Sequence, residues 1–343
     1  MRNAFISGTG SYTPPDVVTN DDLRTRFGID TSHEWILQRT GIEARRFSAA
    51  GVPTSDLGLE AAKRALENAN LAPQDLDLIL FATLSPDHAF PGCGVYLQEK
   101  LGLCDGANAK FVPAMDVRNQ CSGFLYSLAT AHAFVRSGAA KHVLVVGAET
   151  HSPMLDLSTR GRGVATLFGD GAGAVIVSRT EENRGIGEIS LGADGRYADV
   201  LSQKVWDIKK RPFIDVAADG NGRIEPEQLW PQMQGPLVFK HAVERMKQVM
   251  NDVLAAQKWE STEVDLVFFH QANLRINQYV QEVFAIPNEK VISNIQRFGN
   301  TSAATLPLLL DEANRSGRLK RGMKLAFAAF GSGFTWGGAT MTW

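Results

Sequence analysis

The chain has 343 residues, of which 44% are hydrophobic and 21% charged, and its formal net charge is −2. This apolar content excludes a disordered chain and is enough for one large domain or two of ordinary size. A near-neutral charge disfavours nucleic acid and anionic membranes as partners, because both require a concentrated basic surface.

The first residues, MRNAFISGTGSYTPP, lack the hydrophobic region of a signal peptide, and the longest apolar stretches are too short to cross a bilayer. Cys93, Cys104 and Cys121 are too few for a disulfide framework, and no Cys or His cluster has zinc-ligand spacing. We therefore expect a cytoplasmic protein in a reducing compartment, with no membrane segment and no metal site.

The chain contains a repeated pattern of helix and strand. Residues 60–73 have helical periodicity and lead into the apolar run 77–81, which is typical of a buried strand. Residues 242–258 and the run 265–269 repeat this arrangement.

A second pair of segments follows each of these. A helix over 121–138 ends in Arg-Ser-Gly before the strand 142–149, and a helix over 300–317 ends in Arg-Ser-Gly before the strand 324–333. Counting back from the two Ser-Gly ends places Cys121 opposite Asn300.

The sequence thus predicts an α/β fold of two similar halves, 1–180 and 181–343, packed about a pseudo-two-fold axis. The segment 196–234 has no counterpart in the first half and is expected to form a long hairpin or loop over one face. Chance similarity between any two α/β segments is the alternative to a duplication.

Cys121 follows a predicted strand over 111–117 and stands at the start of a helix. Helix N-terminal amides carry a partial positive charge that favours the thiolate, which is the nucleophilic form of cysteine. Such a turn also supplies backbone N–H groups for a developing oxyanion. A buried structural cysteine is the alternative role, and we assign it to Cys93 and Cys104.

Two polar residues of the second half lie at comparable positions. His270 ends the predicted strand 264–269, where α/β folds collect their ligands, and Asn300 stands at a helix start. A hydrogen-bonded core histidine and a helix N-cap are the structural alternatives. If Cys121 and Asn300 begin equivalent helices, the three side chains should meet at the junction of the halves.

Two stretches are rich in glycine. The stretch 169–173 opens a strand and lacks the helix N-terminus that a phosphate-binding loop requires. The stretch 331–336 follows the strand 324–330, and its amides are expected to complete an oxyanion hole opposite Cys121.

These features occur with a set of motifs spread over nearly the whole chain, namely GTGSYTPP, DTSHEWILQRTGI, HAFP, DVRNQCSGF, LFGDGAGAV, HQANLRI, GNTSAA and FGSGFTWG. With them the chain resembles the β-ketoacyl-acyl-carrier-protein synthases III of the thiolase superfamily. The resemblance implies a thiolase-like duplicated five-layer αβαβα fold, a homodimer, and a catalytic triad of Cys121, His270 and Asn300.

The resemblance also implies a coenzyme A site and an acyl pocket, with no cofactor besides the coenzyme A thioesters. Trp35 and Arg162 would flank the adenine, and Phe90 would reach into the partner subunit's acyl pocket. The pocket would be lined in addition by Phe168 and Phe239, and the oxyanion hole would combine the amides of Cys121 and Ser332. The other coenzyme A contacts would be Thr31, Arg39, Lys240, Asn273 and Arg275.

The implied reaction is the decarboxylative Claisen condensation that begins fatty-acid synthesis. Cys121 would attack an acyl-CoA and form an acyl-enzyme. A malonyl thioester, carried on acyl-carrier protein or on coenzyme A, would then bind with its thioester carbonyl held by His270 Nε2 and the Asn300 amide. Loss of CO2 would give an enolate that attacks the acyl-enzyme, which predicts ping-pong kinetics.

Three features depart from the usual pattern of the family. Ser332 replaces the middle glycine of its motif, and Gln281 and Glu282 stand where lysines commonly meet the acidic carrier protein. The excursion at 196–234 is longer, and its basic residues are an alternative carrier dock, made of Lys209, Lys210 and Arg211. A specialised synthase of polyketide or other secondary metabolism, which condenses or transfers unusual acyl groups, is therefore the second interpretation.

Two other classes of protein compete with a condensing enzyme. A papain-like hydrolase also uses Cys, His and Asn in this chain order, but its Cys-Gly-Ser-Cys-Trp neighbourhood is absent around Cys121. A non-catalytic assembly subunit would be favoured by a broken triad, and the triad is intact.

Overall fold

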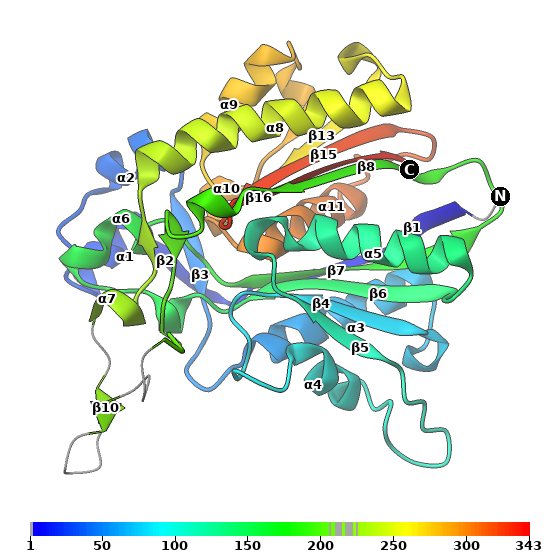
Figure 1. Cartoon of the computed structure of the whole chain (residues 1–343), viewed down its shortest axis with the longest axis horizontal. Helices are drawn as coiled ribbons and strands as arrows, with labels where there is room; N and C mark the ends of the chain where they lie inside the picture. Colours follow the sequence, from blue (N-terminus) through cyan, green and yellow to red (C-terminus); the bar gives the residue numbers. More distant parts are fainter. Residues whose placement is uncertain (1–2, 206, 210–214, 217–221, 224–225) are drawn as a thin grey trace.

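The computed structural model describes residues 3–205, 207–209, 215–216, 222–223 and 226–343. These residues form two five-stranded sheets with helices between and outside them (Figure 1). None of the described helices is long and apolar enough to cross a membrane.

The first sheet comes from the N-terminal half of the chain. Its strands, in spatial order, are β1 (Asn3–Tyr12), β7 (Gly171–Thr180), β6 (His142–Glu149), β4 (Leu78–Ala82) and β5 (Ala114–Val117). β4 pairs in parallel with β5 and β6, and β7 pairs antiparallel with β6 and β1. The central strands are continuous apolar runs because helices cover both faces of the sheet.

The second sheet repeats this plan. Its strands, in spatial order, are β8 (Gly185–Ala193), β16 (Thr335–Thr342), β15 (Lys324–Gly331), β13 (Leu266–Phe269) and β14 (Val291–Ile292). β13 pairs in parallel with β14 and β15, and β16 pairs antiparallel with β15 and β8. Strand order and direction are therefore the same in the two sheets, with β13 in the place of β4.

Helices lie between the sheets and on their outer faces (Figure 1). α5 (Gly123–Ser137) and α11 (Thr305–Arg315) contact both sheets. α3 (Thr54–Ala69) and α4 (Cys93–Lys100) cover the first sheet, and α8 (Gly235–Gln257), with α9 (Leu274–Val283) beside it, covers the second. The predicted five-layer αβαβα arrangement is confirmed.

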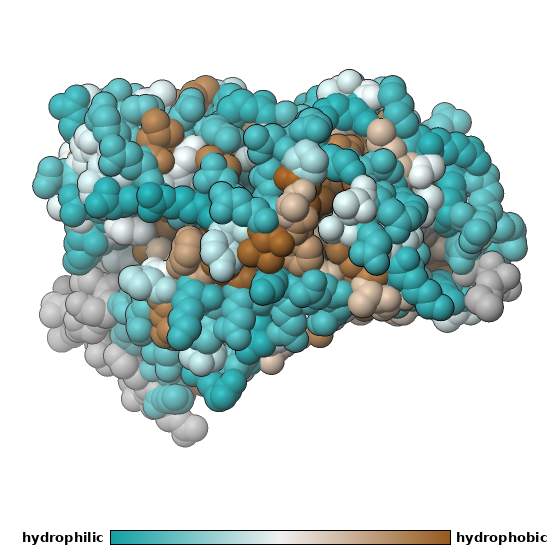
Figure 2. Space-filling model, turned by 90° about the horizontal axis from the view of Figure 1, so that it is seen from above, coloured by the Kyte–Doolittle hydropathy of each residue, from teal (hydrophilic) through white to brown (hydrophobic). Residues whose placement is uncertain are grey.

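The middle layer holds the largest apolar core. Phe124 and Leu128 of α5 and Leu309 of α11 pack against strands of both sheets, where the rings of Phe268 and Phe327 stack with centroids 5.0 Å apart. In contrast to this core, the outer face over α8 and α9 is mostly hydrophilic (Figure 2). The apolar side chains on this face gather near its middle.

Shorter elements complete the described chain. The excursion predicted over 196–234 contains two antiparallel pairs, β9 (Leu201–Ser202) with β12 (Gln232–Met233) and β10 (Asp215–Val216) with β11 (Gly222–Arg223), and the short helix α7 (Pro226–Leu229). Lys210 and Arg211 lie outside the described residues. The remaining elements are β2 (Asp16–Thr19), β3 (Ala44–Phe47), α1 (Asn20–Thr25), α2 (His33–Thr40), α6 (Arg162–Ala165) and α10 (Ile295–Phe298).

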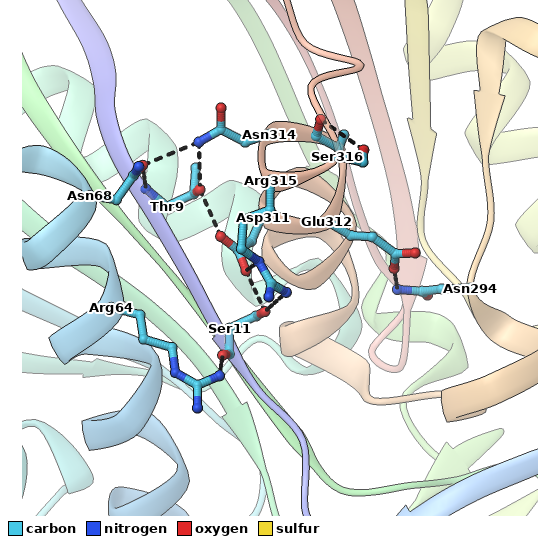
Figure 3. A network of polar contacts seen from close by, with 11 residues as sticks. Thr9, Ser11, Arg64, Asn68, Asn294, Asp311, Glu312, Asn314, Arg315 and Ser316 are labelled. Carbon is cyan, nitrogen blue, oxygen red and sulfur yellow. Dashed lines mark hydrogen bonds and ion pairs between the residues drawn. The ribbon is translucent and has the colours of Figure 1, made fainter.

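A buried carboxylate ties α11 of the second half to β1 of the first (Figure 3). The Asp311 side chain is 2% exposed and accepts hydrogen bonds from Thr9 Oγ1, at 2.8 Å, and from Ser11 Oγ. The Arg315 guanidinium, one turn along the helix, lies 2.8 Å from the same carboxylate. The halves are thus joined by directed polar contacts as well as by apolar packing.

We expect Asp311→Ala to lower the free energy of unfolding by about 3 kcal/mol, because it leaves two hydroxyls and a guanidinium without their acceptor. The matched control on the same helix is Glu312→Ala. Glu312 pairs with Arg297 at the surface and accepts one longer hydrogen bond from Asn294 Nδ2 at 3.3 Å, so its loss should cost about 1 kcal/mol. Urea unfolding measures both values, and equal losses would show that the Asp311 network does not join the halves.

Candidate active site

Cys121 lies in a sharp turn between a strand and a helix. β5 ends at Val117, and residues 120–122 form one 3-10 turn before α5 begins. Gln120, the first residue of this turn, has a φ of 43°, a left-handed value that residues other than glycine rarely adopt. The turn places Cys121 at the foot of α5, where it is only 5% exposed.

The same turn recurs in the second half. Residues 302–304 form a 3-10 turn before α11, and Ser302 has a φ of 44°. This geometry pairs Cys121 with Ala303, so the prediction that Cys121 stands opposite Asn300 is wrong. α5 has 15 residues and α11 only 11, and counting back from their C-terminal ends therefore shifts the register.

Cys121, His270 and Asn300 nevertheless line one cavity of about 470 Å³, here called the first cavity. His270 directly follows β13 and is buried, with its Nδ1 2.7 Å from Thr305 Oγ1. His270 Nε2 has no hydrogen-bond partner among the described residues. Asn300 Oδ1 accepts a hydrogen bond from the Ser302 N–H at 2.8 Å. The Nδ2 donor of the same amide therefore points away from the Ser302 backbone.

Burial dominates the electrostatics of this site. It raises the pKa of the Cys121 thiol to about 12, although the Ser302 hydroxyl and the amides of Cys121 and Ser332 act in the opposite direction. The Cys121 amide at the start of the helix thus acts in the direction that the sequence predicts, and burial opposes it. Burial also lowers the pKa of His270 to about 3, so its imidazole is neutral at physiological pH.

The loop after β15 closes over the sulfur. A Cβ on Gly331 would lie 2.7 Å from the Cys121 Cβ, so only glycine allows the backbone to come this close. The next amide, that of Ser332, is near enough to the sulfur to favour its ionised form. The Ser332 hydroxyl donates to the Leu201 carbonyl of β9, and the serine that replaces the family's glycine thus points away from the sulfur.

A second cavity of about 490 Å³ meets the first at Cys121, Phe168 and Leu201. Phe168 therefore faces both cavities, whereas Phe239 lines only the first. Phe90 lines neither cavity and is 85% exposed. Cys121 thus stands where two separate approaches to its sulfur meet.

Four of the seven residues predicted to bind coenzyme A line the first cavity. Trp35, Arg39, Asn273 and Arg275 line it, whereas Thr31, Arg162 and Lys240 do not. The guanidinium groups of Arg39 and Arg162 lie 4.3 Å and 4.9 Å from the centre of the Trp35 ring. In the part of the chain that the structure describes, no group of three or more His, Cys, Asp or Glu side chains could hold a metal ion.

Comparison with known proteins agrees with this geometry. Residues 115–195 match the family model of 3-oxoacyl-[acyl-carrier-protein (ACP)] synthase III, and residues 254–343 match its C-terminal model. The crystal structure of the synthase III from Aquifex aeolicus VF5 is 40% identical, with a TM-score of 0.87 over 99% of this chain and 100% of that one. The chain belongs to the synthase III family.

Two further solved structures are also similar to this chain over nearly its whole length. The enzyme from Thermus thermophilus is 36% identical, with a TM-score of 0.87 over 99% of both chains. The priming β-ketosynthase of the R1128 polyketide pathway is 31% identical, with a TM-score of 0.86 over 99% of this chain and 96% of that one. The protein is therefore an acyltransferase of the condensing type with a thiolase-like fold.

The sequence did not single out two polar residues beside the nucleophile of this synthase III. The Cys121 thiol donates to Ser302 Oγ at 3.7 Å, and the same oxygen lies 3.1 Å from His151 Nε2. Both residues line the second cavity. Their only sequence signal is position, since His151 comes two residues after β6 and Ser302 lies within the GNTSAA motif.

The Thr305 hydroxyl should set the tautomer of His270. The hydroxyl has one proton and two acceptors within reach, His270 Nδ1 at 2.7 Å and the Ser302 carbonyl at 3.0 Å. When the hydroxyl donates to Nδ1, the neutral imidazole carries its own proton on Nε2 and presents it to the first cavity. We expect Thr305→Val to slow formation of the 3-oxoacyl thioester about tenfold, which corresponds to about 1.4 kcal/mol, and Thr305→Ser to retain the rate. Equal rates for the two variants would show that the hydroxyl does not orient His270.

Proposed function

We propose that this enzyme condenses an acyl-CoA with a malonyl thioester, with loss of CO2, and thereby begins fatty-acid synthesis. The observation that carries the proposal is the position of Cys121 where the two cavities meet, with His270 and Asn300 on the first cavity and the Ser332 amide at the sulfur. Two substrates that react in turn at one sulfur need such an arrangement.

The first step is acyl transfer to Cys121. Its sulfur attacks the thioester carbonyl of the acyl-CoA, and the amides of Cys121 and Ser332 stabilise the oxyanion. The carbon–sulfur bond to coenzyme A then breaks, and coenzyme A leaves through the first cavity. The acyl chain occupies the second cavity, which Leu84, Leu155 and Phe168 line with apolar surface.

The second step uses the first cavity again. A malonyl thioester, most simply malonyl-acyl-carrier protein, places its thioester carbonyl against His270 Nε2 and Asn300 Nδ2. These two donors stabilise the enolate that forms as CO2 leaves. The enolate carbon attacks the acyl-enzyme carbonyl, a carbon–carbon bond forms, and the sulfur–carbon bond to Cys121 breaks. A neutral histidine suits this role, because it donates a proton in a hydrogen bond without carrying charge into a buried site.

Coenzyme A would lie along the first cavity, where Arg39 and Arg275 supply positive charge for the phosphates. Lys240, exposed on α8, would add a further positive charge. The adenine stacks on Trp35, where Arg162 already packs on the ring. Thr31 carries a buried hydroxyl that has no hydrogen-bond partner among the described residues, and Asn273 completes the set.

The edge of the first sheet supports the proposal of a homodimer. β5 is an edge strand, and large apolar side chains are exposed on and near it, namely Phe90, Phe111 and Met115. A second copy of the chain would cover these side chains. Phe90 lines neither of the two cavities described above, which agrees with a role in the partner's acyl pocket.

A specialised synthase of secondary metabolism is the second candidate. The second cavity is lined by polar side chains that a short alkyl chain does not need, namely Arg118, Gln120, His151, Gln203 and Lys204. On α9, the Gln281 side chain is bonded to the Ile286 carbonyl and to Asn288, and it offers no charge to a carrier protein. An acyl group with polar substituents would distinguish this candidate from the first.

Mass spectrometry of the intact protein after incubation with a panel of acyl-CoAs tests the proposal. We expect one acyl adduct whose mass names the first substrate, and we expect a malonyl thioester to discharge it with release of CO2. Cys121→Ala should abolish the adduct, whereas the control Cys104→Ala should keep it. Absence of an adduct with every acyl-CoA, or an adduct on Cys121→Ala, would contradict the proposal.

A further inference from the structure

We propose that His151 accepts the proton of the Cys121 thiol through the hydroxyl of Ser302 when the acyl-enzyme forms. The inference rests on the proposed function, in which Cys121 is the nucleophile. It gives a role to two residues on the second cavity that the condensation steps above leave unused. It also supplies what a thiol needs in order to react, namely an acceptor for its proton.

Two hydrogen bonds link the sulfur to His151, and they run toward His151 in the tautomer that leaves Nε2 unprotonated. The Cys121 thiol donates to Ser302 Oγ at 3.7 Å, and Ser302 Oγ lies 3.1 Å from His151 Nε2. His151 is 3% exposed and Ser302 is fully buried, so water does not compete for either bond. The three atoms thus form a continuous path from the sulfur to an imidazole nitrogen.

The backbone holds Ser302 in this position. Its N–H donates to Asn300 Oδ1 at 2.8 Å, and its carbonyl lies 3.0 Å from Thr305 Oγ1. The left-handed φ of 44° at Ser302 turns the side chain toward the sulfur. The His151 ring packs on Phe168, with ring centroids 4.7 Å apart, which fixes the other end of the path.

His270 is less suited to this proton transfer. The thiol donates its hydrogen bond to Ser302, whereas His270 is bonded through Nδ1 to Thr305. His270 Nε2, which has no partner among the described residues, lines the cavity assigned to the malonyl thioester. The two histidines therefore have different roles. His151 accepts the proton of the Cys121 thiol, and His270 stabilises the enolate.

Protons and bonds balance in this step. The sulfur gives its proton to Ser302 Oγ, and Ser302 passes its own proton to His151 Nε2. The sulfur forms its bond to the acyl carbon, and the bond from that carbon to coenzyme A breaks. The coenzyme A thiolate then takes up one proton and His151 gives one up. Burial leaves both partners neutral at rest, since it raises the pKa of Cys121 to about 12 and lowers that of His151 to about 3.

Other titratable groups surround the path. Glu149, two residues before His151 on β6, is fully buried, and burial raises its pKa to about 7. Its charge raises the pKa of Cys121. Asp170 accepts the N–H and hydroxyl of Ser152 beside His151, and His270 faces Cys121 from the second half. The experiment therefore compares variants with the unaltered protein over the same pH range.

The test measures alkylation of Cys121 by iodoacetamide between about pH 6 and pH 10, with peptide mass spectrometry to separate it from Cys93 and Cys104. His151→Gln keeps a hydrogen-bond acceptor for Ser302 but cannot hold the proton, and His151→Leu removes both functions. We expect both variants, and Ser302→Ala, to react about tenfold more slowly at neutral pH, with the rise in rate displaced to higher pH.

The matched control is His142→Gln. His142, at the first position of β6, lies 2.8 Å from the Ser178 hydroxyl, so it forms a histidine–serine contact like that of His151 but away from Cys121. Cys121 in the His142→Gln variant should therefore be alkylated at the rate of the unaltered protein. An unchanged alkylation profile for His151→Gln would overturn the proposal, as would one for Ser302→Ala. Alkylation needs no acyl substrate, and the outcome is therefore independent of whether acyl-CoA labels Cys121.

Discussion

The backbone contact between the two halves at Cys121 is the constraint on which the rest of the site depends. Gly331, at the end of β15, approaches Cys121 so closely that a Cβ would lie 2.7 Å from the cysteine Cβ. The first half makes the reciprocal contact, since a Cβ on Gly147 of β6 would meet the Ala303 carbonyl oxygen at 2.2 Å. Each sheet therefore closes on the turn that begins the other half's central helix, and neither half contains the site alone.

This packing explains the electrostatics. The close packing at this junction leaves Cys121, His151 and His270 at most 5% exposed. This burial raises the pKa of the Cys121 thiol and lowers those of His151 and His270. The site has no standing charge on these groups, so its reactivity depends on hydrogen bonds aimed at particular atoms. The corresponding turn of the second half has the same 3-10 conformation, but Ala303 stands where the first half has Cys121. The Ala303 N–H donates a hydrogen bond to the buried carboxyl of Glu149.

The sequence predicts the fold better than it predicts the local chemistry. Apolar runs and Ser-Gly helix ends are local signals, and they were sufficient for the two repeated sheets and for placing Cys121, His270 and Asn300 near one junction. The residue-by-residue correspondence between the halves has no local signal. Because α11 is shorter than α5, counting from the helix ends wrongly placed Asn300 opposite Cys121. The resting state of Cys121 and the contact of Ser302 with His151 depend on burial and on chain segments far apart in sequence, which no motif reports.

The central claim is that the approach of Gly331 to Cys121 places the Ser332 amide where the oxyanion forms. The rate of acyl-enzyme formation in Gly331→Ala tests it most directly, with Gly195→Ala as the control, since a Cβ at Gly195 meets nothing within 4 Å. We predict that Gly331→Ala folds but acylates about a hundredfold more slowly, the loss typical of one misplaced oxyanion donor, while Gly195→Ala acylates normally. Acylation of Gly331→Ala at the rate of the unaltered enzyme would contradict the account.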